Sequence, residues 1–152
     1  MEYKNIMVAI DESDSSNLAL KEAIRLTKEL NAKLHVLYIV DETIFNKVDE
    51  YVEFDLLWSA HREFGQRILD KAQQVLNTSG VDFTMKLSEL KPNEGRLAEK
   101  IVSEANSLPA DLLVVGTHGR KGFSRLFLGS VAENVIRIAT LPVLLVRELK
   151  VL

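Results

Sequence analysis

The chain has 152 residues, 47% apolar and 27% charged, a balance typical of one globular domain spanning residues 1–152 rather than of a disordered segment. The formal net charge is −3 and the basic residues are scattered, which argues against a nucleic-acid or membrane partner. The absence of cysteine excludes disulfides and thiolate metal sites, and it suits a reducing compartment.

Five runs of apolar residues predict strands. In chain order they are residues 6–10, 34–40, 81–87, 112–115 and 143–146. The first run is too short for a signal peptide or a membrane helix, so we expect a cytoplasmic location. Four runs lack polar alternation, which indicates a parallel sheet covered on both faces. The run at residues 81–87 alternates and predicts an edge strand.

Stripes of apolar residues at helical spacing fill the gaps between the predicted strands. They are Ala19, Ala23, Leu26 and Leu30; Phe64, Ile68, Ala72, Val75 and Leu76; Leu97, Ile101 and Ala105; and Val131, Val135, Ile136 and Ala139. The polar run at residues 13–16 is typical of a helix start, and Gly80 of the turn that follows a helix. Strand and helix therefore alternate, which predicts a doubly wound α/β sheet with right-handed crossovers.

Residues 41–57 do not fit this alternation. The segment is acidic and aromatic, and it is long for a connection between a strand and a helix. Long connections often form lids or partner surfaces. The simpler interpretation is a helical insertion that packs its aromatic side chains on the domain.

A glycine-rich segment, residues 116–130, follows the fourth predicted strand. Glycines at such a turn let backbone amides approach a ligand, and the amides at a helix start carry partial positive charge. Gly129 and Ser130 begin the next predicted helix. The glycine-rich turn and this helix start together predict a phosphate site. Arg120 and its basic neighbours add positive charge. The alternative is that the glycines only form turns and the basic side chains only a solvated face.

Asp11 favours the phosphate site over that alternative. It ends the first predicted strand, so it lies at the same sheet edge as Gly116 if the two strands are neighbours. A carboxylate there suits a ribose hydroxyl or a Mg²⁺ ion beside phosphates. The alternative role for Asp11 is a helix cap with Ser13.

Asp11 and the glycine-rich segment make the sequence resemble the universal stress protein family, in particular its ATP-binding branch. That branch is marked by the pattern Gly-x2-Gly-x9-Gly-Ser/Thr, which Gly116, Gly119, Gly129 and Ser130 match in full. The similarity covers essentially the whole chain and is strongest from residue 111 to residue 147.

The resemblance implies a five-stranded, adenine-nucleotide alpha-hydrolase-like sheet of order 3-2-1-4-5 that binds ATP and Mg²⁺. It implies that Asp11 and Ala9 contact ribose and adenine, and that Val40 meets adenine through its backbone. Asp11 is also the candidate Mg²⁺ ligand. The residues implied around the phosphates are Gly116, Gly119, Arg120, Gly129, Ser130 and Val131. Homodimers built around the last strand are usual in the family.

Three hypotheses for function follow. The first is a nucleotide-dependent stress-response regulator or signal transducer with an unknown protein partner. The second is an ATPase or nucleotidyl transferase, for which His118 and Glu133 are the candidate bases. The third is an interaction module of the same fold that binds no nucleotide. The intact glycine pattern argues against the third hypothesis. Because candidate bases are few, we expect at most slow ATP hydrolysis, which favours the first hypothesis over the second.

Overall fold

A computed structural model describes residues 2–42, 54–118 and 128–148. Its strands form a five-stranded parallel sheet of order β3-β2-β1-β4-β5. They are β1 (Asn5–Ile10), β2 (Lys33–Asp41), β3 (Asp82–Leu90), β4 (Leu112–Gly116) and β5 (Val143–Val146). The predicted fold class and strand order are therefore confirmed.

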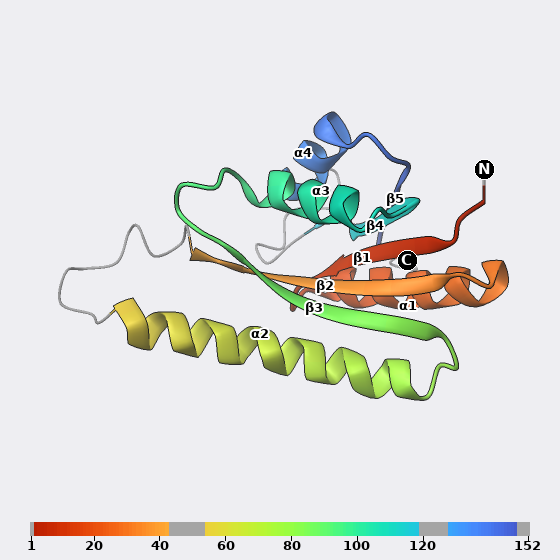
Figure 1. Cartoon of the computed structure of the whole chain (residues 1–152), viewed down its shortest axis with the longest axis horizontal. Helices are drawn as coiled ribbons and strands as arrows, with labels where there is room; N and C mark the ends of the chain where they lie inside the picture. Colours follow the sequence, from red (N-terminus) through yellow and green to blue (C-terminus); the bar gives the residue numbers. More distant parts are fainter. Residues whose placement is uncertain (1, 43–53, 119–127, 149–152) are drawn as a thin grey trace.

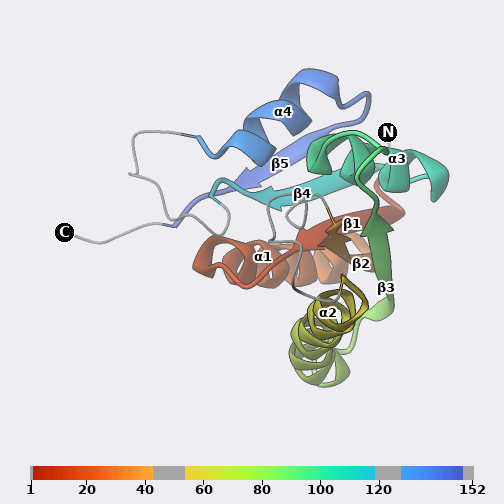
Figure 2. The same cartoon turned by 90° about the vertical axis from the view of Figure 1, so that its left-hand side faces the viewer.

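Helices cover both faces of the sheet (Figure 1). They are α1 (Asp14–Leu30), α2 (Phe54–Asn77), α3 (Leu97–Ser107) and α4 (Ser130–Ile138). Helices α1 and α2 lie on one face, and α3 and α4 lie on the other, as the view turned by 90° also shows (Figure 2). The helical connections therefore change face between α2 and α3, and the sheet is doubly wound as predicted.

The central strands are buried on both faces because their side chains alternate between two cores. Ile6, Val8 and Ile10 of β1 pack with α1 and α2, whereas Met7 packs with α3 and α4. Strand β3 alternates between exposed and half-buried side chains over most of its length, as its sequence predicted for an edge strand. Strand β5 is the edge strand on the other side of the sheet.

Helix α1 begins where the polar run predicted a helix start. Ser13 is its N-cap, and the Ser13 Oγ accepts a hydrogen bond from the Ser16 amide at 3.1 Å. This cap satisfies one amide of the first turn and turns the chain sharply after β1. The start of α1 therefore lies beside the carboxyl end of β1.

The buried face of α2 follows the predicted stripe in part. Ala72 and Leu76 are buried and Ile68 packs against the core, as predicted, whereas Val75 is 46% exposed and Leu69, outside the stripe, is buried. Gly65 also lies on this face, because a Cβ there would lie 2.6 Å from the ring of Tyr38, so the helix backbone approaches β2 closely at this point. The aliphatic spacing therefore located most of the buried face of α2, but not its boundary at Val75.

Candidate functional site

The sheet creates a crevice between the carboxyl ends of β1 and β4. These two strands pair directly, with Ile6 opposite Leu112 and Val8 opposite Val114. The chain leaves β1 toward α1 on one face, whereas α4, which follows β4, covers the other face. Strand connections that diverge in this way leave room for a ligand between them.

A cavity of about 340 Å³ occupies this crevice, within the size range of small-molecule sites. It is lined by the ends of β1, β2 and β4 together with parts of α1, α3 and α4. The lining residues are Ala9, Ile10, Asp11, Ser16, Leu37, Tyr38, Ile39, Asp41, Leu97, Ile101, Val115, Gly116, Thr117, His118, Gly129, Ser130, Val131 and Ala132. Segments far apart in the sequence therefore converge here.

Most of the predicted site residues that the structure describes lie together in this lining. They are Ala9, Asp11, Gly116, Gly129, Ser130 and Val131. Gly119 and Arg120 lie outside the described residues. The side chain of Val40 is buried in the core on the α1 and α2 side, and the cavity is lined instead by its neighbours Ile39 and Asp41. Only the backbone of Val40 remains a candidate for ligand contact.

The start of α4 forms part of the cavity wall. Gly129 is the N-cap, has an extended conformation and provides no side-chain cap. Its amide donates to the Thr117 carbonyl at 2.7 Å, which fixes the start of the helix against the turn after β4. The first amides of a helix have no partner within the helix, and the helix dipole adds positive charge there. Ser130 and Val131 of this first turn line the cavity, so the geometry suits an anion.

Asp11 is placed so that capping and ligand contact do not exclude each other. Its Oδ1 accepts a hydrogen bond from the Ser13 amide at 2.7 Å, and its own amide donates to the Ser16 Oγ at 2.7 Å. These bonds hold the turn between β1 and α1. The same residue lines the cavity together with the start of α4. The turn fixes the position of the carboxylate in advance of any ligand.

Ser15 connects the cavity to the last strand, a role that no pattern in the sequence indicates. Its side chain is buried, donates to the Val146 carbonyl at 3.3 Å, and accepts a hydrogen bond from the His118 amide at 3.3 Å. Gly116 makes this contact possible, because a Cβ on Gly116 would lie 2.9 Å from the backbone of Ser15. Gly116 is therefore needed for packing against α1, whatever its role toward a ligand.

His118 is tied into the turn after β4. The Thr117 Oγ1 and the His118 Nδ1 are 3.1 Å apart, and the His118 carbonyl accepts from the Ser13 Oγ at 3.3 Å. The residue also lines the cavity. Backbone and hydroxyl contacts therefore hold its ring near the space that a ligand would occupy.

The cavity walls supplied by β2 and α3 were not predicted from the sequence. Leu37 and Ile39 alternate along β2 on the side of the cavity, and Leu97 and Ile101 lie opposite on α3. The strand residues could have been identified by counting every second residue back from the end of β2, because alternate residues of a strand face the same side. Asp41 shares that side and lines the cavity at its rim.

The described residues contain no group of three or more His, Cys, Asp or Glu side chains arranged to hold a metal ion. Mg²⁺, however, usually binds proteins through one or two carboxylates and takes its other oxygens from phosphate and water. Asp11 lines the cavity together with the start of α4, so its donor chemistry fits that mode of binding. Glu42 follows Asp41 in the chain. Its pKa is raised, mainly because the carboxyl is buried and secondly because the negative charge of Glu89 lies nearby.

Comparison with known proteins identifies the family. A model described as "Universal stress protein family" matches residues 2–147. The chain belongs to the universal stress protein family. It is 37% identical to Universal stress protein MJ0531 of Methanocaldococcus jannaschii over 97% of this chain and 84% of that protein.

Solved structures of the family share the fold. A universal stress protein from Burkholderia pseudomallei is 33% identical, with a TM-score of 0.78 over 95% of this chain and 96% of its own. A universal stress protein solved in complex with cAMP is 27% identical, with a TM-score of 0.65 over 96% of this chain and 98% of its own. Among the residues described here, no helix has the length and apolar character needed to cross a membrane.

Proposed function

We propose that this universal stress protein binds an adenine nucleotide, ATP with Mg²⁺, and so belongs to the ATP-binding branch of its family. The observation that carries the proposal is the convergence of Asp11 and the first turn of α4 on one cavity. The similar protein solved with cAMP supports a nucleotide as the ligand. The role that follows is a nucleotide-dependent regulator or signal transducer in the stress response, acting in the cytoplasm on a protein partner.

In this proposal each wall of the cavity binds one part of the nucleotide. The amides of Ser130 and Val131 donate to phosphate oxygens, and the helix dipole stabilises their charge. The Asp11 carboxylate accepts hydrogen bonds from ribose hydroxyls or holds Mg²⁺, which would neutralise phosphate charge. Ala9 at the end of β1 contacts the nucleoside, and Gly119 and Arg120 complete the phosphate side.

The direct test is to purify the protein from cells and identify any co-purified nucleotide by mass spectrometry. Calorimetry on the nucleotide-free protein then measures its affinity for ATP with and without Mg²⁺. We expect an adenine nucleotide and saturable binding. A protein that carries none and binds none at millimolar concentration would be an interaction module without a ligand.

We expect at most slow ATP hydrolysis. His118 lies in the cavity but is held by the turn, and a general base needs a position within hydrogen-bonding reach of the attacking water. Phosphate release at saturating ATP and Mg²⁺ should be slow and should differ little in a His118→Ala variant. A large loss of turnover in that variant would make the protein an enzyme.

We also propose a homodimer that forms through β5. This strand is an edge strand of the sheet, and its apolar residues Val143 to Val146 are all partly exposed. Exposed apolar edge strands favour pairing with a second copy. Sedimentation equilibrium should give twice the chain mass of 17.1 kDa. A single-chain mass at high concentration would contradict the dimer.

A further inference from the structure

The cavity has two chemically different ends. One end contains the backbone donors of α4 and the Asp11 carboxylate. The other end lies between β2 and α3 and is lined by Leu37, Ile39, Leu97 and Ile101. Aliphatic walls of this kind suit an aromatic base, and their side chains offer it no hydrogen bonds.

The strand order places these two ends in a fixed sequence. The start of α4 follows β4, Asp11 follows β1, and the aliphatic wall belongs to β2, which is the next strand along the sheet. Neighbouring strands are about 4.8 Å apart, so the three positions are spaced like the phosphate, ribose and base of one nucleotide. If the phosphates bind at α4, as the proposed function states, the base lies over β2.

Asp41 lies beyond the aliphatic wall. In the register of the sheet, the last residue of β1, Ile10, pairs with Tyr38, so β2 continues for a further three residues. That extension is about 10 Å at 3.3 Å per residue. Asp41 alternates to the same side of β2 as Leu37 and Ile39, is half-buried, and lines the cavity. Its carboxylate therefore belongs to the rim of the aliphatic end of the cavity, beside the space assigned to the base.

We propose that Asp41 is a specificity residue that selects a base with an exocyclic amine facing this rim, a 6-aminopurine over a 6-oxopurine. An ionised carboxylate has only acceptors, so it binds an amine and repels a carbonyl oxygen. The aliphatic walls of β2 and α3, between which the base lies, weaken competition from water and strengthen both effects. This inference rests on the proposed function, and it adds the chemical group that distinguishes adenine from hypoxanthine.

The test compares the affinities of ATP and of its 6-oxo analogue ITP by calorimetry in the wild type and in Asp41→Asn. We expect the wild type to bind ATP about tenfold or more tightly than ITP. The reason is that ITP would place a carbonyl oxygen, which is an acceptor, against the acceptor oxygens of Asp41. Asn has nearly the same size, and its amide can turn its NH₂ group toward a carbonyl. The ratio should therefore approach one in Asp41→Asn, mainly through tighter ITP binding.

Asp82→Asn is the matched control, because Asp82 begins the neighbouring strand β3 at the far end from the cavity and its side chain is 75% exposed. It should leave the ATP to ITP ratio unchanged. An unchanged ratio in Asp41→Asn would overturn the inference. So would an equal loss of affinity for ATP, ITP and ribose 5-phosphate, which would place Asp41 against the sugar.

The test also separates this inference from the proposed function. Binding of ATP and ITP by the wild type with equal affinity would overturn the role of Asp41 and leave nucleotide binding intact. Preference for ITP or GTP would likewise overturn the choice of base. Failure of the wild type to bind any of these nucleotides would overturn the proposed function together with the inference.

Discussion

The amino edge of the sheet, where the strands begin, and the carboxyl edge, where they end, use polar residues in different ways. At the amino edge the polar groups pair with one another. The Asp111 Oδ2 accepts hydrogen bonds from the amides of Lys4 and Asn5, both at 2.8 Å. The ring nitrogens of His35 lie 2.6 Å from the Thr84 Oγ1 and 3.0 Å from the Asn5 Oδ1. These bonds connect β1 and β2 with β3 and with the start of β4, so at that edge the polar groups named here serve the structure of the sheet.

At the carboxyl edge the polar groups instead surround a cavity. Asp11 and the first turn of α4 line it, and Thr117 and His118 complete the rim. The internal bonds at this edge, such as Ser13 to Asp11 and Gly129 to Thr117, position these groups. Polar groups therefore stabilise the amino edge, whereas at the carboxyl edge they also line a cavity. Substitutions at the two edges should therefore separate stability from binding.

The largest effect is expected for Gly116→Ala. The added methyl group would lie 2.9 Å from backbone atoms of Ser15, which cannot move without displacing α1. We expect a loss of about 3 kcal/mol in the free energy of unfolding, at the upper end of overpacking effects, measured by urea denaturation. Nucleotide affinity should fall as well, because the turn after β4 would shift.

Gly80→Ala is the control for that substitution. Gly80 has the opposite constraint, because its φ is +80 but nothing lies within 4 Å of a Cβ there. Its cost should be only the strain of a left-handed alanine, about 1 kcal/mol. Equal losses in the two variants would show that the contact of Gly116 with Ser15 is relieved at little cost and does not make glycine necessary there.

Asp11→Ala should mainly reduce binding. We expect ATP affinity to weaken by about 1–3 kcal/mol, the range for a lost charge-assisted hydrogen bond, as measured by calorimetry. Asp11→Asn keeps an oxygen for the Ser13 amide, so it should preserve stability and still lose affinity. If both variants bind ATP as tightly as the wild type, Asp11 only holds the turn before α1.

Asp111→Ala should have the opposite profile. It removes the acceptor for the two amides at the amino edge, and we expect a loss of about 1 kcal/mol in the free energy of unfolding. ATP affinity should not change, because Asp111 is at the far end of β4 from the cavity. Weaker ATP binding in this variant would mean that the two edges are coupled through the strands.

The main groups of the carboxyl edge could be predicted from the sequence, but their supporting contacts could not. Aliphatic runs located the strands, and the family resemblance implied their order, so the sequence alone was enough to assign Asp11 and Gly129 to one edge. Ser15 could not be identified, because its role depends on a contact with Val146, 131 residues away. Asp41 was missed because the last residues of a strand, and the side they face, depend on how far that strand pairs with its neighbour.

The amino edge was not predicted. His35 belongs to a predicted strand, but its sequence neighbours do not indicate that it is 8% exposed and bonded on both sides of its ring. Burial first, and then Lys33, lower the pKa of His35 from its ordinary value of 6.5, while Asp82 opposes the shift. Buried polar pairs of this type follow no spacing rule in the sequence, since they join three separate strands.

That pKa shift predicts how stability depends on pH. The unfolded chain binds a proton at His35 more readily than the folded protein does, so the stability contributed by neutral His35 is present above 6.5 and lost as the pH falls toward the folded pKa. The free energy of unfolding should therefore decrease in mildly acidic buffer. His35→Gln should remove this component of the decrease. An identical pH profile in that variant would assign the decrease to other groups.

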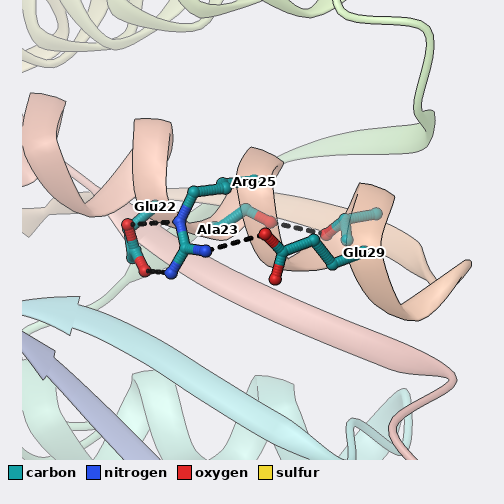
Figure 3. Close-up of polar contacts among 5 residues, drawn as sticks. Glu22, Ala23, Arg25 and Glu29 are labelled. Carbon is teal, nitrogen blue, oxygen red and sulfur yellow. Dashed lines mark hydrogen bonds and ion pairs between the residues drawn. The ribbon is translucent and has the colours of Figure 1, made fainter.

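The smallest effect is expected away from both edges, on the outer surface of α1. Arg25 pairs there with Glu22 and Glu29, at the spacing of successive helix turns (Figure 3). The hydrogen bond and charge of Arg25 lower the pKa of Glu22. The Arg25 and Glu29 side chains are more than half exposed and Glu22 is partly exposed, so water and salt screen their attraction. Arg25→Ala should leave ATP affinity unchanged and lower the thermal midpoint slightly at low salt. That difference should disappear in concentrated salt, and a loss that persists there would mean that the Arg25 stem packs against the helix.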